Sequence, residues 1–508
     1  MSLPKIAGLE QEYALKSKGA AGLSPFQISC LLVNAYARRR GLRQPGSRIL
    51  WDYAHETPFQ DGRGSLFSKS ARPEISSPED NLLINAPLPN GGRLYTDHAH
   101  PEYSTPECLG AREVTAADKA GEAILWQGLA ALRELLPDCQ VELYKNNNDL
   151  QGHSYGTHEN YLMSAAGYQR LLAQEPARTV ATLVPFLVSR QLFTGAGRVG
   201  GPTGYELSQR AEFLTALFGL ETTHNRSLIN TRDEPHADPQ RFRRLHLILG
   251  DANLSEFANF LKVGTTQLVL SLLEDDLLPR LELREPLAAL RQVSQEWTAP
   301  LALSDGRRLT ALELQEQFLE EVAAHPASYA WHPEAEAVLQ AWSQTLEGLR
   351  QGQITPAWDL EDDPLELRRR LDWLAKLWLV QRYRRQKNLS WDNPTLQVLD
   401  LQYHRLDPEN GLFFQLQRQG LMERLLSDQE IDALVTDPPA TTRAFFRGRC
   451  LERFPDEVAM VNWEVIAFRR QDLCRMIPLP NPLQGTRGQM QELFDRAQDA
   501  FELIKLLA

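Results

Sequence analysis

Cysteine is scarce in this sequence, and its spacing excludes the motifs that depend on it. No two cysteines form a Cys-x-x-Cys pair, and their number is odd. A zinc ribbon needs such pairs, and a disulfide scaffold needs an even, closely spaced set. We therefore expect reduced thiols and a cytoplasmic protein. The five residues are Cys30, Cys108, Cys139, Cys450 and Cys474.

Long apolar runs are also missing. No stretch reaches the roughly 18 uninterrupted apolar residues of a membrane-spanning helix, and residues 1–10 lack the apolar segment of a signal peptide. The 66 acidic residues outnumber 54 basic ones, which gives a net charge of −12. Such a charge disfavours non-specific binding to nucleic acid. We expect neither a membrane nor a nucleic-acid partner.

Familiar nucleotide and nucleophile motifs are absent or out of context. The P-loop pattern Gly-x-x-x-x-Gly-Lys-Ser/Thr does not occur. Residues 195–200 match Gly-x-Gly-x-x-Gly, but Pro202 follows closely and obstructs the helix that would receive a pyrophosphate. Residues 152–156 match Gly-x-Ser-x-Gly, but an Asn-rich run precedes them where that motif requires a strand. A glycine-rich turn and a polar loop are the better interpretations.

The composition is that of a large globular protein. With 508 residues, 43% of them hydrophobic, the chain has core material for one large domain with additions or for two to three domains. Thr115 is expected to cap a helix that runs to about Leu136. Apolar spacing of three and four residues predicts later helices. These lie at 255–276, 307–325, 334–352 and 364–386.

Residues 93–107 combine a strand pattern with reactive side chains. Alternation places Arg93, Tyr95 and Asp97 on one strand face, and Pro101 is expected to end the pairing. Glu102 and two histidines follow directly. A polar strand end in solvent would explain this segment taken alone.

Two other segments carry similar chemistry. In the strand predicted over residues 4–15, Glu10 and Glu12 share a face about 7 Å apart, so they are either solvated or hold a cation. Within 208–256, alternation puts Arg244 and His246 on one face. Carboxylates bind magnesium and guanidinium groups bind phosphate oxygens, so these clusters suit a magnesium nucleotide. Structural ion pairs are the alternative.

Several motifs stand in order along the chain. They are Gly-Leu-Glu-Gln-Glu-Tyr at 8–13, Arg-Leu-Tyr-Thr-Asp-His-Ala-His-Pro-Glu-Tyr-Ser at 93–104, Ser-Tyr-Gly-Thr-His-Glu-Asn-Tyr-Leu at 154–162, Ile-Asn-Thr-Arg-Asp-Glu-Pro-His-Ala-Asp at 229–238, Arg-Arg-Leu-His at 243–246, Lys-Val-Gly-Thr-Thr at 262–266 and Phe-Arg-Gly-Arg-Cys at 446–450. In this order they resemble the family of Pup depupylases and Pup ligases, which is related to carboxylate-amine ligases of the glutamine synthetase type. His98 to Pro101 directly after Asp97, and a long insertion at 41–82 with a Trp-Asp-Tyr island, resemble the depupylase branch.

The resemblance implies an α+β fold. It comprises a glutamine synthetase-like catalytic domain over 1–435, with a curved antiparallel β-sheet cradle flanked by helices, and a small C-terminal domain over 436–508. It implies ATP and Mg²⁺ as cofactors, with Mn²⁺ possible because histidines take part. Pup and pupylated proteins are the implied partners. The implied activity is deamidation of Pup's C-terminal glutamine and cleavage of the isopeptide bond between Pup and a substrate lysine.

Carried over position by position, the resemblance also implies roles for single residues. Asp97 would be the catalytic carboxylate, and Arg210, Arg232 and Arg244, with Tyr95, would bind the nucleotide. The metal ligands would be Glu10, Glu12, Tyr95, Glu102, His158 and His246.

Some residues depart from the family pattern. Gln11 and Ala14 stand where relatives often have Thr and Gly, His153 replaces a small residue, and Ala54-His55 replace acids in the insertion. Three other functions therefore stay open. They are an ATPase or phosphotransferase that does not act on Pup, a Pup ligase, and a non-catalytic Pup-binding module.

Overall fold

The computed structural model describes residues 3–19, 22–42, 49–54, 56–69, 77–149, 151–352, 358 and 365–507. Parts of the predicted insertion, at 43–48, His55 and 70–76, lie outside these residues, as does the expected helix start at 364. In the described part, no helix is both long and apolar enough to cross a membrane.

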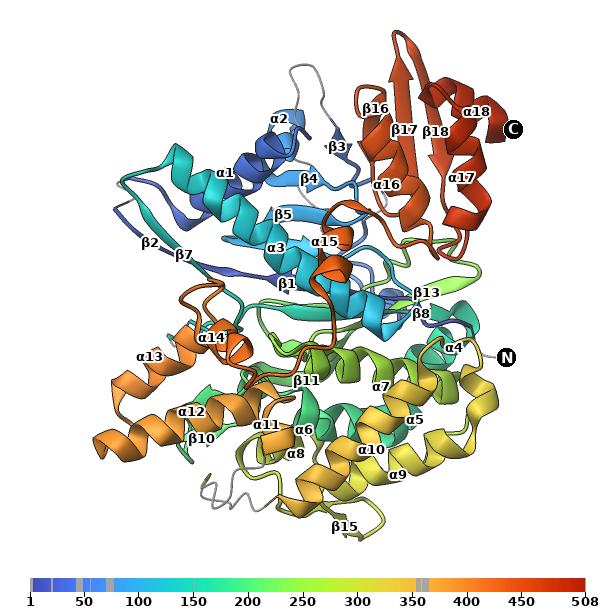
Figure 1. Cartoon of the computed structure of the whole chain (residues 1–508). Coiled ribbons are helices and arrows are strands. Elements are labelled where there is room, and N and C mark those ends of the chain that lie inside the picture. The colour runs from blue at the N-terminus through green and yellow to red at the C-terminus, as the bar shows by residue number, and fades with distance from the viewer. Residues whose placement is uncertain are drawn as a thin grey trace.

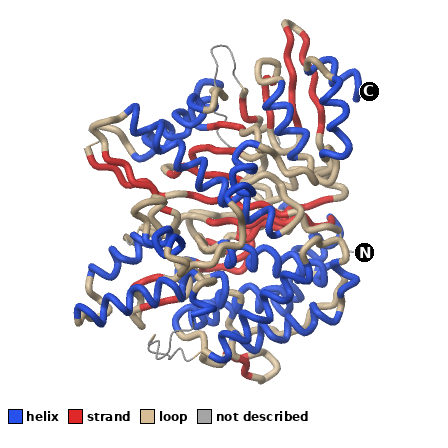
Figure 2. Tube along the Cα trace, in the orientation of Figure 1, coloured by secondary structure: helices blue, strands red, loops and turns tan. Residues whose placement is uncertain are grey.

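An eight-stranded sheet lies at the centre of the molecule (Figures 1 and 2). Its neighbours pair antiparallel, as expected, except for the parallel pair β11 and β12. The sheet and its helices confirm the α+β class. The strands, in sheet order, are β11 (Leu214–Gly219), β12 (Arg226–Asn230), β13 (Phe242–Leu247), β8 (Thr157–Ser164), β1 (Ala7–Glu12), β6 (His100–Ser104), β5 (Arg93–Asp97) and β4 (Asn85–Pro87).

Helices cover one face of this sheet. Every second residue along each strand points to that face, and these residues are mostly apolar. Leu9, Leu94, Tyr103, Tyr161 and Leu245 are buried in the core on this face. The longer helices packed in these clusters are α1 (Pro25–Arg39), α3 (Ala111–Leu135), α5 (Pro176–Ser189), α7 (Glu256–Glu274), α9 (Ala311–Ala324), α10 (Ala335–Gln351) and α12 (Asp372–Lys387). The opposite face carries the polar residues of the same strands.

The remaining helices and strands are short. The helices are α2 (Pro78–Ile84), α4 (Ala165–Gln169), α6 (Gln191–Thr194), α8 (Pro286–Gln295), α11 (Leu365–Arg368), α13 (Pro394–Tyr403), α14 (Leu412–Arg418) and α15 (Asp428–Thr436). The strands, paired outside the main sheet, are β2 (Ala14–Lys18), β7 (Gln140–Tyr144), β9 (Arg198–Val199), β10 (Tyr205–Glu206), β14 (Leu301–Ala302) and β15 (Arg308–Leu309).

A separate hydrophobic cluster occupies the C-terminal part, which Figure 1 shows at the upper right. A short strand of the insertion, β3 (Leu50–Trp51), pairs with β16 there, so this sheet joins distant parts of the chain. The boundary at 435/436 stays a prediction. The other elements are β16 (Val458–Val461), β17 (Val465–Arg470), β18 (Leu473–Pro478), α16 (Ala444–Arg453), α17 (Arg487–Arg496) and α18 (Ala500–Leu507).

Two local expectations were wrong. Pro101 does not end the pairing, because it lies within β6 opposite Thr96, and its carbonyl accepts a hydrogen bond from the Tyr13 amide. Thr115 does not cap its helix, since α3 begins at Ala111 and the Thr115 hydroxyl donates to the Ala111 carbonyl inside the helix. This back-bonding satisfies a hydroxyl in a helix interior.

Candidate functional site

The predicted site residues of β1, β5, β6, β8 and β13 gather on the face of the sheet that the core helices leave free. Strand register explains this, because Glu10 pairs with His158, Glu12 with Glu102, and Tyr95 with Glu102. Residues two apart on a strand share a face, so Asp97 and Arg244 follow Tyr95 and His246 onto it. The shared facing of Glu10 with Glu12, Tyr95 with Asp97, and Arg244 with His246 is confirmed.

Glu10 lies at the centre of the first group of polar side chains. His158 Nδ1 lies 3.2 Å from Glu10 Oε2, and Asn160 Nδ2 donates to Glu10 Oε1 at 3.0 Å. Burial alone would raise the pKa of Glu10, but the hydrogen bond from His158 and the charge of Arg244 hold it well below its usual value. Glu10 is therefore a carboxylate. Since His158 donates to it from Nδ1, the Nε2 lone pair of a neutral His158 is available to a metal.

Arg244 fixes the orientation of His246. Its Nη1 lies 2.7 Å from His246 Nδ1, and its Nη2 pairs with Glu234 Oε2 at 2.9 Å. A guanidinium can only donate, so Nδ1 accepts and the Nε2 of a neutral His246 carries the proton. That Nε2 is buried and has no hydrogen-bond partner among the described residues. This arrangement suits donation to an anion. Glu10, His158 and His246 nevertheless offer ligand atoms within 4.8 Å of one another, so His246 would complete a metal site with them if Arg244 moved away.

Glu12, Asp97 and Glu102 form a second group, in which each residue offers an oxygen within 4.8 Å of the others. Burial and the neighbouring carboxylates, Asp97 first among them, raise the pKa of Glu102 well above its usual value. Among the main influences on the Glu102 pKa there is no Lys or Arg of the described chain, only carboxylates and Tyr95 beside the effect of burial. The group thus has negative charge that a bound cation would offset.

Tyr95 borders this second group without being an anion itself. Burial and the carboxylates of Glu102 and Glu10 raise the pKa of the Tyr95 phenol well above its usual value. Tyr95 and Glu102 are cross-strand neighbours on β5 and β6. As a protonated group, the Tyr95 phenol can donate a hydrogen bond to a carboxylate or a bound anion.

Two arginines beside Glu12 have no carboxylate partner within the described chain. Arg210 is fully buried and donates to neutral oxygens, including Ile248 O at 2.8 Å. Burial, together with the charge of Arg226, lowers the pKa of Arg210 to about 10. Arg226 donates to Ser154 O at 2.7 Å. The pair suits an anion such as a phosphate group. Sequence reasoning included Arg210 but missed Arg226.

Arg232 reaches the site from the end of β12. Its Nε is buried without a hydrogen-bond partner in the described residues, and its charge acts on Asp97. Partial burial raises the pKa of Asp97, but His98, Arg232 and His158 outweigh that effect and keep the pKa below its usual value. Asp97 is therefore ionised and able to accept a proton.

Arg93 attaches the insertion to the site. Its guanidinium lies over the rings of Trp51 and Tyr95, 4.2 and 4.0 Å from their centroids. It also donates to the Tyr53 hydroxyl at 2.8 Å. The Trp-Asp-Tyr island predicted from sequence is thus held against β5 by cation–π contacts.

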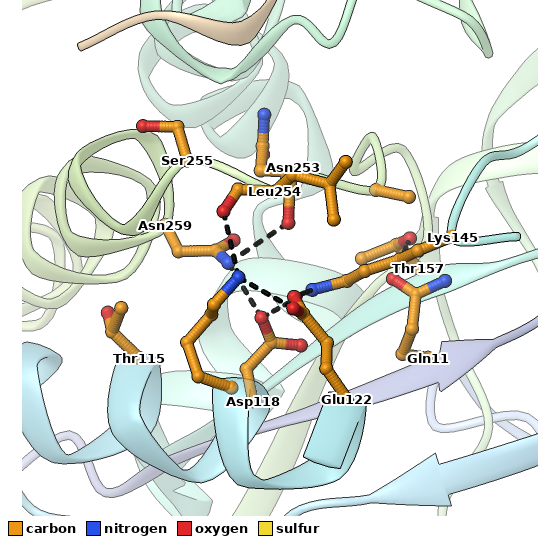
Figure 3. Close-up of polar contacts among 12 residues, drawn as sticks. Gln11, Thr115, Asp118, Glu122, Lys145, Thr157, Asn253, Leu254, Ser255 and Asn259 are labelled. Atoms are coloured by element: carbon orange, nitrogen blue, oxygen red, sulfur yellow. Dashed lines mark hydrogen bonds and ion pairs between the residues drawn. The ribbon is translucent and has the colours of Figure 1, made fainter. Parts of the chain in front are cut away.

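A network of buried polar residues lies on the helix-covered side of β1 and holds this strand in place (Figure 3). Lys145 Nζ donates to Asp118 Oδ2 at 2.6 Å and to Glu122 Oε1 at 2.9 Å, all from fully buried positions. In the loop that follows β7 and begins at Lys145, Asn147 donates to Thr157 Oγ1, which in turn donates to Gln11. Gln11 lies between Glu10 and Glu12, so the network holds both carboxylates in register.

A cavity extends from Glu10 and Arg244 toward the C-terminal elements. Its walls include Trp463, His236 and Arg443, to which sequence reasoning assigned no role. His236 belongs to the motif at 229–238, whereas Trp463 and Arg443 come from the C-terminal part of the chain, and only folding brings them to this cavity. The Trp463 ring packs at 5.2 Å from that of Trp51.

The family model described as Pup-ligase protein matches residues 5–467. A depupylase of Acidothermus cellulolyticus is 41% identical, covering 99% of each chain. A Pup deamidase/depupylase of Mycolicibacterium smegmatis is also 41% identical, covering 99% of this chain and 100% of that one. A Pup–protein ligase of Acidimicrobium ferrooxidans is 41% identical over only 72% of this chain and 79% of its own.

Two solved structures are similar along most of the chain. The ligase PafA in complex with the prokaryotic ubiquitin-like protein Pup has a TM-score of 0.76 and 31% identity, covering 99% of this chain and 94% of that one. PafA in complex with ADP has a TM-score of 0.70 and 34% identity, covering 83% and 91%.

Proposed function

The chain belongs to the Pup-ligase protein family, and we propose that it is an ATP-dependent amide hydrolase acting on Pup. It deamidates the C-terminal glutamine of Pup and cleaves the isopeptide bond between Pup and substrate lysines. The observation that carries this proposal is the extent of similarity. In sequence, two relatives named as depupylases align over nearly their whole length, whereas the Pup–protein ligase of Acidimicrobium ferrooxidans aligns over 72% of this chain.

The geometry of the site supports ATP and magnesium as cofactors. Glu10, Glu12 and Glu102 are the oxygen ligands that Mg²⁺ prefers, and the unbalanced charge around Glu102 fits a cation there. His158 offers a nitrogen ligand, and Mn²⁺ would also suit that mixed set. Arg210, Arg226 and Arg232 would contact the phosphates. When bound, the metal would supply a positive charge beside the reacting carbonyl.

In this proposal, Asp97 has the role of activating the attacking group. It is ionised, lies beside the carboxylates proposed as metal ligands, and its side chain is 43% exposed, so a macromolecular substrate can reach it. We assign it to orienting and deprotonating a water or another attacking oxygen. Arg232 stands close enough to stabilise developing negative charge.

The deciding experiment mixes the protein with ATP, Mg²⁺ and a Pup-conjugated protein and follows release of the free protein on a gel. Release that requires ATP supports the proposal. ATP turnover without release would contradict it and favour the ATPase or phosphotransferase. New conjugates formed from Pup and free protein would indicate a ligase, and binding with neither reaction a non-catalytic module.

We also assign the cavity beside Glu10 to the nucleotide base. Replacing Trp463 with Ala should raise the KM for ATP about tenfold, because stacking of a base on an aromatic ring contributes about 1 to 3 kcal/mol. The measurement is the initial rate of conjugate cleavage against ATP concentration. Trp463→Phe keeps a ring and should stay near wild type. A fall in kcat at unchanged KM would contradict the assignment.

A further inference from the structure

His98 occupies an unusual backbone position beside the proposed reacting group. Asp97 pairs with His100, so His98 and Ala99 form a two-residue loop between β5 and β6. His98 has a φ of +51°, in the left-handed region that glycine adopts most readily and that asparagine, aspartate and histidine adopt more often than other residues. The loop therefore places an imidazole beside Asp97 at a position that glycine would also fit.

The imidazole of His98 is bonded to Asp97 and faces solvent. Its Nδ1 lies 3.0 Å from Asp97 Oδ2, and its side chain is 68% exposed. Since Asp97 is ionised, Nδ1 donates, and Nε2 is left to meet a substrate. The charged groups facing the ring are Asp97, Glu12 and Arg232. Asp97, by its hydrogen bond and charge, raises the pKa of His98 above its usual value.

His100, two residues on, serves a different purpose. Its ring stacks on Tyr155 with centroids 4.6 Å apart, and its Nδ1 lies 3.0 Å from the Tyr13 carbonyl. It is therefore held by the fold on both sides. Of the two histidines beside Asp97, only His98 combines exposure with a bond to the reacting carboxylate.

We propose that His98 is a catalytic residue that protonates the leaving amine, an inference that rests on the proposed function. An alkylamine, whose ammonium form has a pKa of about 10, leaves an amide only if its nitrogen is protonated. Asp97 takes a proton from the attacking water, whose oxygen bonds to the carbonyl carbon. The C–N bond then breaks, its electron pair goes to nitrogen, and the nitrogen receives the Nε2 proton of the His98 imidazolium, which becomes a neutral imidazole. Asp97 and His98 regain their starting states by proton exchange with solvent.

Leaving-group dependence tests this role. In His98→Gln, kcat for an isopeptide-linked Pup conjugate should fall about 10²-fold, whereas a 4-nitrophenyl ester of the same Pup carboxyl group should change by less than about threefold. The ester needs no proton because its leaving group departs as a stable anion. Equal losses on both substrates would overturn the proposal, since a purely structural effect would impair them alike.

His153 provides the matched control. It also faces solvent, with a 79% exposed side chain, and its Nδ1 lies 2.7 Å from Asp149 Oδ2. Neither residue belongs to the set formed by Glu12, Asp97 and Glu102. His153→Gln should leave both rates unchanged. The wild-type isopeptide rate should fall as pH rises through the raised pKa of His98, and this fall should vanish in His98→Gln. If the wild type cleaves neither substrate, the proposed function fails instead.

Discussion

Replacing Asp97 with Asn is expected to lower the rate of isopeptide cleavage by at least about 10³-fold, the upper part of the range for a lost proton-transfer group. Asn keeps the shape of the side chain but cannot accept a proton. The ionised Asp97 is also the hydrogen-bond partner of His98. The substitution therefore removes the proton acceptor and, in addition, the negative charge beside the proposed proton donor. Single-turnover cleavage of a Pup conjugate at saturating ATP measures the effect.

Nucleotide binding separates this outcome from a damaged site. Asp97→Asn should bind ATP with a Kd within about threefold of wild type, a change below about 1 kcal/mol. Glu102→Gln is the contrasting variant, because it removes a proposed metal ligand and should weaken metal-dependent ATP binding as well. If Asp97→Asn lost ATP binding to the same degree, Asp97 would be a ligand and another group would start the reaction.

The facing of the site residues could be predicted from sequence because it depends only on strand alternation. Glu10 with Glu12 and Tyr95 with Asp97 are two apart on their strands, so any β conformation puts them on one side. Their roles came from resemblance to a known family. The geometry refines two of them, since Tyr95 remains a neutral donor and His246 carries its proton on Nε2.

Features that depend on distant pairing could not be predicted. The approach of Trp463 to the site and the position of β3 in the C-terminal sheet both join segments that lie far apart in sequence and carry no local signal. Pro101 misled the prediction for a related reason. Proline lacks only the amide donor, and whether a strand needs that donor depends on its neighbours.

Glu107 is expected to be among the most important residues for stability, and Glu107→Gln should lower the free energy of unfolding by about 3 to 5 kcal/mol. Arg443 Nε donates to Glu107 Oε1 at 2.8 Å, and Arg447 contacts both carboxylate oxygens. The side chains of Arg443 and Arg447 are only 3% and 2% exposed. The amide would leave two guanidinium groups buried beside a neutral partner. Urea denaturation followed by tryptophan fluorescence measures the loss.

A matched variant and the pH dependence distinguish this buried cluster from an ordinary surface ion pair. Glu430 pairs with Arg112 but is 40% exposed, and Gln preserves its capping box, so Glu430→Gln should cost less than about 1 kcal/mol.

Burial alone would raise the pKa of Glu107, but Arg447 and Arg443 lower it to about 2. A depressed pKa gives stability that is complete above the unfolded-state value, about 4.3, and is lost as pH falls toward 2. The stability difference between wild type and Glu107→Gln should therefore shrink as the pH falls from about 5 to about 2. A difference independent of pH would show that Glu107 contributes by shape and not by charge.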